Sequence, residues 1–564
     1  MDYQSRYSMW MKADLPNDIM TELASIADNV EELKSRFGSE LQFGTAGMRG
    51  IMGAGSNRLN RYTVRRAAQG MAAWLASTDL PKRAAIGYDS RHNSKLFAEV
   101  CAVAFAEKGI QAFLYDRLAP TPMLSYAVRQ LKCGCGIVIS ASHNSGEYNG
   151  VKCYGPDGCQ MTDEPAAIVT KTIEAIPYFV PEEKSFDAYR SESQIVYIDE
   201  KLWENYYGSV LTEAIDPDLI RKANLSVVYT PLCGTGNEPV REVLGRLGTN
   251  IIVVSCQENP DGDFKTCEYP NPETDAALNE SYKVAATTQC DVILGTDPDC
   301  DRVAIAVKEG SGFRKLSGNE LGCLLMDYIL RARKELHNLP EDGIVVRSIV
   351  SSPLADRIAE NYGVMMKTVL TGFKYIGGEI LNLEQHGQEH RFIFGFEESC
   401  GYLKGTYARD KDAVVASMLV CELAAYLKLQ NKSILDALRE LYANYGYYTA
   451  KVQNIELTGA NAMEKAAQIM SDLRAKSPEM IGGVSVSAIR DYQSRIHTDM
   501  PSGNVSAIDL PKSNVLEYCL GTKGSVIVRP SGTEPKVKFY FTAVGADADD
   551  AKVLLDKMIL DMTN

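Results

Sequence analysis

Strand-like and helix-like segments alternate along most of this chain, and this alternation limits the folds that are open to it. The first series lies between Lys82 and Ser142. Apolar runs typical of buried strands are separated by amphipathic runs with helical spacing, in the order 84–88, 94–108, 111–115, 121–131 and 136–140. Such βαβ alternation is typical of a sheet covered by helices. We therefore predict an α/β domain in this part of the chain.

The same alternation returns twice before the pattern changes. A second series follows at 225–229, 238–247, 250–254, 274–288 and 292–295. A third runs through 319–336, 344–349, 354–362, 365–369, 376–383 and 392–394. After Tyr445 the order becomes strand 447–452, helix 461–474, strands 525–528 and 537–543, and a helix from Ala548. The sequence predicts three similar α/β domains with mixed sheets, followed by a smaller C-terminal α+β domain.

Composition limits the kinds of binding partner and the cellular compartment that we expect for this protein. The chain has 564 residues, enough for about three to five domains, and a net charge of −14 from 59 basic and 73 acidic residues. No long basic run interrupts this acidic background, so we expect no nucleic-acid partner. The 14 cysteines lack paired metal-finger spacing, and the chain shows no signal-peptide or membrane-spanning segment. We expect a soluble, cytoplasmic protein that binds no membrane.

Each of the three α/β series ends a strand with a polar loop, and these loops are candidate sites because α/β sheets hold ligands at the carboxyl ends of their strands. The first loop, Ser140 to Asn144, contains two hydroxyls and an imidazole. Taken alone it also fits an ordinary turn, since Ser, His and Asn are common in turns. The second loop begins at Asp297 and the third near Glu397. We expect the three loops to converge on one site.

The second loop carries three carboxylates at alternate positions, Asp297, Asp299 and Asp301. Alternate side chains of an extended segment lie on one side, and hard oxygen ligands this close together suit Mg²⁺. A solvated acidic turn explains an isolated triplet about as well. Arg302 favours the metal site, because it is placed to neutralise a carboxylate or to hold a phosphate.

Glycine-rich loops with basic residues indicate phosphate binding. The loop from Arg529 to Lys536 combines a guanidinium, two hydroxyls, a glycine and a lysine, although a plain Pro/Gly turn remains an alternative. Arg49 and Lys374 lie in two further loops of this kind, and Lys374 comes just before a helix. The segment 395–401 offers carboxylates that suit sugar hydroxyls, or a solvated charged turn. Together these segments indicate phosphoryl transfer on sugars.

Four of these segments stand in the order found in one known family. They read SASHN, TDPDCDR, GFEESCGY and RPSGTEPK, and the match extends from Gly44 to Lys536. The chain resembles the α-D-phosphohexomutase superfamily, which includes phosphoglucomutase and phosphomannomutase. The resemblance implies three α/β domains and a mobile fourth domain around a central cleft. We place the domains at 1–203, 204–312, 313–445 and 446–564.

The resemblance also implies roles for individual residues. Ser142 is expected to carry the phosphoryl group, with Mg²⁺ held by a phosphoserine oxygen and by Asp297, Asp299 and Asp301. Glu397 and Ser399 match the sugar-binding loop, whereas the loop that grips the remote phosphate of the substrate is matched by Arg529, Ser531, Gly532 and Thr533. Other cleft positions of the family are occupied by Arg49, His143, Lys152, Arg302 and Lys374. Lys411 matches a lysine proposed for proton transfer in the phosphoglucomutase branch, and Lys152 and His143 are the other candidates for a base.

The expected activity is the interconversion of glucose 1-phosphate and glucose 6-phosphate through a phosphoserine and a sugar 1,6-bisphosphate, which also serves as activator. The third loop lacks the histidine common in bacterial phosphomannomutase/phosphoglucomutase enzymes, which favours the phosphoglucomutase side. Phosphomannomutase, phosphopentomutase and sugar 1,6-bisphosphate synthase remain alternatives. Two alternatives from other classes also remain. One is a phosphatase with Asp297 as nucleophile, although Asp301 stands where the motif of such phosphatases requires Thr or Val. The other is a phosphosugar-binding regulator that is not an enzyme.

Overall fold

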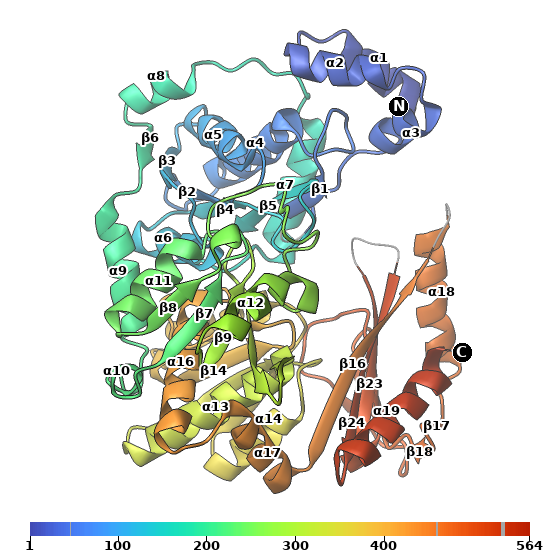
Figure 1. Ribbon diagram of the computed structural model, residues 1–564. Coiled ribbons are helices and arrows are strands. Elements are labelled where there is room, and N and C mark those ends of the chain that lie inside the picture. The colour runs from blue at the N-terminus through green and yellow to red at the C-terminus, as the bar shows by residue number, and fades with distance from the viewer. Residues whose placement is uncertain (45–46, 458–460, 532–535, 564) are drawn as a thin grey trace. The chain divides into compact units, whose positions relative to one another are not determined.

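A computed structural model describes residues 1–44, 47–457, 461–531 and 536–563 (Figure 1). The chain forms two compact units, which are described in turn. The first consists of Met1–Leu321 together with Ile376–Asn431, and the second of Gly322–Tyr375 together with Lys432–Asn564. The predicted fold class is confirmed, because three α/β segments are followed by an α+β segment at the C-terminus (Figure 1).

The first α/β segment contains a mixed six-stranded sheet in the order β1-β5-β4-β2-β3-β6. Its strands are β1 (Gly47–Ile51), β2 (Arg83–Tyr88), β3 (Gln111–Leu114), β4 (Cys135–Ile139), β5 (Tyr148–Tyr154) and β6 (Ile195–Tyr197). β2 is parallel to β3 and β4, and β3 to β6, whereas β5 is antiparallel to β4 and β1. Strand β4 is apolar throughout because helices cover both of its faces.

The helices of this segment form two layers. α4 (Arg61–Ala76), α5 (Ser94–Ala106) and α7 (Asp163–Ala175) share a buried core with alternate residues of β2, β4 and β5. α6 (Thr121–Gln130) packs on the other face, so closely that a Cβ on Gly136 would lie 2.6 Å from a methyl group of Val128. The apolar periodicity that predicts α5 and α6 therefore reflects packing against the sheet, whereas α4 and α7 lie outside the predicted series.

The second α/β segment repeats this design with a five-stranded sheet in the order β11-β10-β9-β7-β8. Its strands are β7 (Ser226–Thr230), β8 (Asn250–Val253), β9 (Val292–Thr296), β10 (Val303–Glu309) and β11 (Gly312–Lys315). β7 is parallel to β8 and β9, and β10 is antiparallel to β9 and β11. The helices are α9 (Glu200–Leu211), α10 (Leu219–Lys222), α11 (Asn237–Arg246) and α12 (Asp275–Thr287), and α12 shares a core with β7 and β9.

The third α/β segment contributes to both units. In the first unit, β14 (Phe392–Glu397) pairs antiparallel with β15 (Gly401–Leu403), and the buried helix α16 (Ala413–Leu429) follows. In the second unit, β12 (Ile344–Ser348) pairs in parallel with β13 (Met365–Val369), and α14 (Leu354–Tyr362) connects them. Helices α13 (Gly318–Glu335) and α15 (Phe373–Gln385) cross the boundaries of the units.

One kind of loop recurs in the first unit. Antiparallel strands follow β4, β9 and β14 in sequence, and the connections carry the three polar loops predicted from the sequence. In each loop one residue other than glycine has a left-handed backbone: Ser142 with φ 51°, Cys300 with φ 53° and Cys400 with φ 59°. We call the segments 140–147, 297–302 and 398–400 the three hairpin loops.

The C-terminal segment is an antiparallel seven-stranded sheet in the order β16-β24-β23-β22-β19-β20-β21. The strands are β16 (Tyr447–Glu456), β19 (Ala488–Asp491), β20 (Ile496–Asp499), β21 (Val505–Ala507), β22 (Leu516–Cys519), β23 (Gly524–Pro530) and β24 (Lys536–Gly545). Helices α18 (Ala462–Ala475) and α19 (Ala548–Thr563) share its core. Helix α17 (Ile434–Tyr445) precedes β16, and β17 (Met480–Ile481) pairs with β18 (Val484–Ser485) as a short hairpin.

Three helices that the periodicity analysis does not predict precede β1. They are α1 (Tyr3–Met11), α2 (Asn17–Ser25) and α3 (Val30–Phe37), and they pack around the fully buried Trp10 and Phe37. A short helix α8 (Phe186–Ser191) lies later in the same unit. Of the described residues, no single helix is long and apolar enough to span a bilayer, and only α16 and α17 taken together pass that test.

Asn60 is expected to be one of the more sensitive polar positions of the first unit. Its side chain caps α4 by accepting from the N–H groups of Tyr62 and Thr63, and its amide donates to the carbonyls of Gly53 and Gly55. Asn60→Ala should lower the free energy of unfolding by about 1–3 kcal/mol, since it removes the cap and leaves buried carbonyls without a donor.

Urea unfolding followed by tryptophan fluorescence measures this change. Asn57→Ala is the control, because the described contacts of the Asn57 side chain comprise one exposed hydrogen bond, to the carbonyl of Ser35. Equal destabilisation by the two substitutions would contradict the prediction.

Candidate active site

Ser142 lies in the first hairpin loop with its hydroxyl facing the second. Its Oγ donates to Oδ2 of Asp297 over 2.7 Å and lies 3.2 Å from Nδ1 of His143. Its backbone N–H donates to Oγ of Ser140 over 2.8 Å. The side chain is buried. Of the two serines in the SASHN segment, Ser142 therefore presents its hydroxyl to the carboxylates, while Ser140 supports the loop.

The second hairpin loop brings its three carboxylates together. Asp297, Asp299 and Asp301 are buried, and one oxygen of each lies within 4.8 Å of the others. Oδ1 of Asp297 accepts the N–H groups of Asp301 and Arg302, so the loop folds back on its first carboxylate. Among the described atoms, the buried Oδ1 of Asp299 and Oδ1 of Asp301 accept no hydrogen bond. Buried oxygens without donors, in a set of hard ligands, fit a divalent cation such as Mg²⁺.

The surroundings shift the pKa values of the three carboxylates in different directions. Burial raises the pKa of Asp297 well above its usual range, and the charges of Asp299 and Asp301 add to this effect. Burial works in the same direction on Asp299, but the charge of Lys152 and hydrogen bonds from Lys152, Asp297 and Thr121 together lower the pKa of Asp299. The pKa of Asp301 is also lowered, because Lys152 and Lys411 outweigh burial and the charge of Asp299.

Two lysines supply the positive charge next to these carboxylates. Nζ of Lys152, on β5, lies 2.5 Å from Oδ2 of Asp299 and 3.1 Å from Oδ2 of Asp301. Nζ of Lys411, just before α16, lies 3.3 Å from the same oxygen of Asp301 and 3.0 Å from Oδ1 of Asp410. Burial alone would lower the pKa of both amines, but the carboxylates raise it above the usual value. Both lysines are therefore held as cations.

Local contacts fix Lys411. Asp412 caps α16 by accepting from the N–H groups of Val414 and Val415, and its other oxygen accepts from the hydroxyls of Tyr206 and Tyr407. The hydroxyl of Tyr154 donates to Asp410 over 2.8 Å. The segment from Arg409 to Asp412 is thus buried and ordered by hydrogen bonds.

His143 lies in the first hairpin loop, and Arg49 contacts this loop. Burial, together with the charges of Arg302 and Arg49, lowers the pKa of His143 well below its usual value. His143 is therefore neutral near pH 7, with Nδ1 directed at the serine hydroxyl. Arg49, on β1, is more exposed and donates to Oδ1 of Asn144 over 2.7 Å.

The third hairpin loop is connected to the site by a backbone hydrogen bond and by the charge of the neighbouring Glu397. The carbonyl of Cys400 accepts the N–H of Val303 over 3.1 Å, which ties the third loop to the second. Glu397 is buried at the end of β14, and its charge raises the pKa of Lys411 and Arg302. Arg302 also forms an ion pair of 2.6 Å with Glu273. Ser399 lies in the turn between β14 and β15.

The remaining predicted residues belong to the second unit. Lys374 lies in the first turn of α15, not before the helix, with Nζ 5.0 Å from the ring centre of Tyr375. Arg529 is on β23, and the N–H of Ser531 donates to the carbonyl of Lys536 over 2.8 Å. Gly532 and Thr533 lie outside the described residues.

Sequence reasoning misses four residues that hold this arrangement: Arg91, Thr121, Glu273 and Asp410. The hydroxyl of Thr121 donates to Oδ2 of Asp299 over 2.9 Å. Arg91 was detectable, since it follows the predicted strand 84–88 at its carboxyl end. Glu273 gave no local signal, because its partner Arg302 is 29 residues away.

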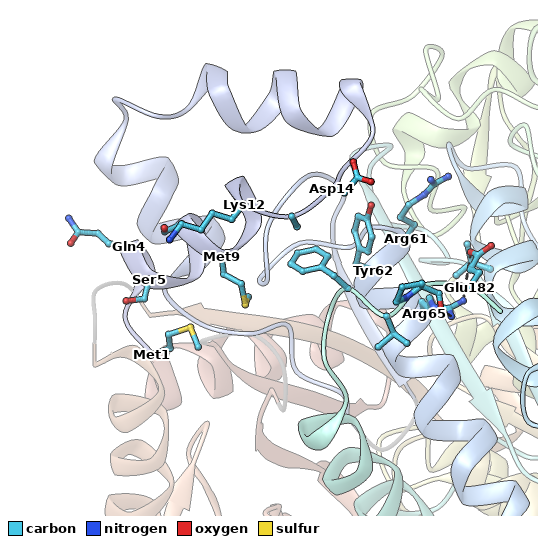
Figure 2. Close-up of a pocket in the computed structure, with 16 residues that line it drawn as sticks. Met1, Gln4, Ser5, Met9, Lys12, Asp14, Arg61, Tyr62, Arg65 and Glu182 are labelled. Carbon is cyan, nitrogen blue, oxygen red and sulfur yellow. Dashed lines mark hydrogen bonds and ion pairs between the residues drawn. The ribbon is translucent and has the colours of Figure 1, made fainter.

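A separate cavity of about 1110 Å³ lies at the N-terminal helices (Figure 2). Helix α1, the start of α4 and the segment 179–182 form its walls, with Tyr62 between Asp14 and Arg61 (Figure 2). None of its 16 lining residues is a predicted site residue. Its lining includes the cations Lys12, Arg61 and Arg65 and the carboxylates Asp14 and Glu182, but it contains no glycine, unlike the predicted phosphate loops.

Models of the phosphoglucomutase/phosphomannomutase family match four successive parts of the chain. The α/β/α domains I, II and III match residues 40–178, 204–310 and 317–445, and the C-terminal domain matches residues 493–558. The chain belongs to this family. As a phosphohexomutase, it is an isomerase.

Individual proteins agree with this assignment. A phosphoglucomutase of Staphylococcus epidermidis is 36% identical over 533 residues, which cover 94% of each chain. The fold is similar to that of a putative phosphomannomutase from Thermus thermophilus, with a TM-score of 0.68 at 21% identity, covering 93% of this chain and 100% of the other. An N-acetylphosphoglucosamine mutase of Aspergillus fumigatus, in complex with GlcNAc-6P and magnesium, matches with a TM-score of 0.53 at 16% identity, covering 98% and 100%.

The carboxylate triplet predicts metal-dependent stability. Mg²⁺ should raise the thermal unfolding midpoint, by about 2–4 °C for each kcal/mol of binding free energy, because the ion binds the folded state. Asp299→Asn should abolish most of this shift, since it removes a buried charged ligand.

Differential scanning fluorimetry over a range of Mg²⁺ concentrations is the measurement. Asp275→Asn serves as control, because this carboxylate is exposed in the first turn of α12. The prediction is wrong if Asp299→Asn keeps the shift seen in Asp275→Asn.

Proposed function

We propose that this protein is a phosphoglucomutase that interconverts α-D-glucose 1-phosphate and glucose 6-phosphate. The observation that carries the proposal is the 2.7 Å contact between Ser142 Oγ and Asp297 in a buried carboxylate triplet. A hydroxyl at this position is next to the ligands expected of a metal, as phosphoryl transfer requires. The relatives at 35–36% identity that bear the name phosphoglucomutase support the choice of sugar.

The residues present fit Mg²⁺, which would be held by Asp297, Asp299, Asp301 and an oxygen of phosphorylated Ser142. When bound, the ion supplies positive charge that stabilises the phosphoryl group during transfer. Lys152 and Lys411 add fixed positive charge next to Asp299 and Asp301. Arg302, anchored by Glu273, places a further cation at the end of the loop.

In the proposed cycle, phosphorylated Ser142 donates its phosphoryl group to the free hydroxyl of the hexose phosphate, which yields a bound 1,6-bisphosphate. After the intermediate turns around, its other phosphate returns to Ser142 and the isomer leaves. The serine hydroxyl must lose a proton on the return, and the neutral imidazole of His143, 3.2 Å from Oγ, is a suitable acceptor. Lys411 and Lys152 are assigned to the proton transfer at the sugar hydroxyl.

Sugar and phosphate recognition are assigned to separate loops. Glu397 and Ser399 are proposed to accept hydroxyl hydrogen bonds from the sugar. The fourth domain is placed at 446–564, and one of its loops is proposed to bind the phosphate that does not react. The residues of this loop are Arg529, Ser531, Gly532 and Thr533. Arg49 and Lys374 are proposed as further contacts of the substrate. Exclusion of water by this domain would protect phosphorylated Ser142 from hydrolysis. We also propose a cytoplasmic location and activation by a sugar 1,6-bisphosphate.

Ser142→Ala tests the covalent cycle. Turnover of glucose 1-phosphate should fall on the order of 10⁴-fold or more, because the phosphoryl carrier is lost. Intact-mass measurement after incubation with glucose 1,6-bisphosphate should show one added phosphate in the unaltered protein and none in the variant. Ser145→Ala is the control, since Ser145 contacts Arg91 through its backbone carbonyl.

Retained activity in Ser142→Ala would favour a phosphatase that uses Asp297 as nucleophile. An unaltered protein that takes up no phosphate and turns over no sugar phosphate would favour a phosphosugar-binding regulator.

A comparison of glucose, mannose and ribose 1-phosphates, with the matching bisphosphate present, tests the choice of sugar. We expect kcat/KM to be highest for glucose 1-phosphate by at least about tenfold, because a site built to hydrogen-bond particular hydroxyls discriminates against altered ones. Glu397→Gln should reduce this preference more than it reduces binding of inorganic phosphate. A strong preference for ribose 1-phosphate would identify a phosphopentomutase instead.

A further inference from the structure

A single buried arginine holds the backbone of the first hairpin loop. Nη1 of Arg91 donates to the carbonyls of Ser145 and Tyr148 over 2.7 and 3.0 Å. Nη2 donates to the carbonyl of Ser142 over 2.6 Å and to that of Asn144. One guanidinium thus binds four carbonyls within seven residues. Its side chain is fully buried, so it is not available to a substrate.

The arginine is itself held in place. Nε of Arg91 lies 3.3 Å from Oδ2 of Asp89, and Oδ1 of Asp89 accepts the N–H of Arg91 and the hydroxyl of Ser94. The ring of Phe264 covers the guanidinium, with its centre 4.9 Å from Cζ. Phe264 belongs to the second α/β segment, so this contact joins the first two segments at the loop.

Close backbone packing leaves the loop little room to move. A Cβ on Gly146 would lie 2.7 Å from the carbonyl oxygen of Gly262, and a Cβ on Gly262 would lie 2.7 Å from the backbone nitrogen of His92. The turn that carries Arg91, the first hairpin loop and the segment near Phe264 therefore form one packed junction.

The side chains of Ser140 and Arg91 hold the backbone of Ser142 at its N–H and at its carbonyl. Ser140 Oγ accepts the N–H of Ser142, and Arg91 binds its carbonyl. Between them Ser142 keeps the left-handed φ of 51°, which is unfavourable for a residue with a side chain. This conformation directs Oγ at Asp297.

We propose that Arg91 is a positioning residue for phosphoryl transfer, which holds Ser142 in the left-handed conformation that aims Oγ at the carboxylate triplet. The inference rests on the phosphoserine chemistry proposed above. Lysine cannot replace arginine here, because a single ammonium group cannot span four carbonyls in the fixed geometry of a guanidinium.

Arg91→Lys tests the proposal. A misplaced nucleophile should lower kcat on the order of 100-fold, whereas KM for glucose 1-phosphate should stay near that of the unaltered protein because Arg91 does not reach the substrate. The rate at which glucose 1,6-bisphosphate phosphorylates Ser142, followed by intact mass, should fall by a similar factor.

Arg66→Lys is the matched control. Arg66 is also buried, donates to the carbonyls of Ile173 and Ile176, pairs with Glu40 and lies over the ring of Tyr178, and none of these described contacts is with the loop of Ser142. Both variants should lower the thermal midpoint, and only Arg91→Lys should slow phosphorylation of Ser142. Equal phosphorylation rates in the two variants would overturn the proposal.

A second variant covers the case in which Arg91→Lys does not fold. Ser140→Ala removes the hydroxyl that accepts the N–H of Ser142 and changes the side-chain volume little. It should also lower kcat and leave KM for glucose 1-phosphate near that of the unaltered protein. Unchanged kcat in Ser140→Ala would then overturn the proposal. If the unaltered protein takes up no phosphate at Ser142, the proposed function fails; if it does and the variants match it, only the role of Arg91 fails.

Discussion

The burial of three carboxylates within 4.8 Å of one another is the constraint on which the site depends. Carboxylates removed from water are costly unless cations and hydrogen bonds compensate them. Here the compensation comes from other parts of the chain: Lys152 from the strand after the first loop and Lys411 from the segment after the third. The need to balance this charge therefore brings the carboxyl ends of three successive sheet segments to one place. Ser142 is buried as a consequence, and its hydroxyl has Asp297 as acceptor.

The three hairpin loops show how one backbone design serves three kinds of chemistry. Each has one residue other than glycine in the left-handed region, at Ser142, Cys300 and Cys400. Such residues cost about 1–3 kcal/mol each and persist only where surrounding contacts enforce them. Arg91 and Ser140 enforce it in the first loop, and the N–H of Ala413 binds the carbonyl of Cys300 in the second. The repeated turn carries Ser142 in the first loop, the carboxylate cluster in the second and Ser399 beside the buried Glu397 in the third, so the loops differ in side chains while each keeps one left-handed residue.

Periodicity predicts the elements that pack against the sheets, and it fails where stability comes from contacts far apart in the sequence. The helix at 354–362 and the strand at 365–369 are found with their correct bounds, because their apolar faces are regular. The helices α1 to α3, each of nine residues or fewer, are missed because their burial depends on one another and on Trp10. In the site, the Asp297 triplet is visible as a pattern, whereas Lys152 and Lys411 were assigned only by resemblance to a family. No local signal marks a lysine whose partner lies 147 residues away.

The charges around the triplet distinguish three residues that sequence reasoning treated alike as candidates for a base: Lys152, Lys411 and His143. A lysine that accepts a proton needs a depressed pKa, and burial acts in that direction on Lys152 and Lys411. The neighbouring carboxylates act more strongly and raise both values, so the resting amines are charged donors. His143 has the opposite balance, because burial and two arginines keep its imidazole neutral beside the serine hydroxyl. In the proposed cycle this favours His143 as acceptor of the serine proton on the return step, when the charged Lys411 can give a proton to the sugar oxygen that loses its phosphate. In the first transfer, by contrast, the sugar hydroxyl loses a proton, so a lysine can accept it there only after losing its own proton.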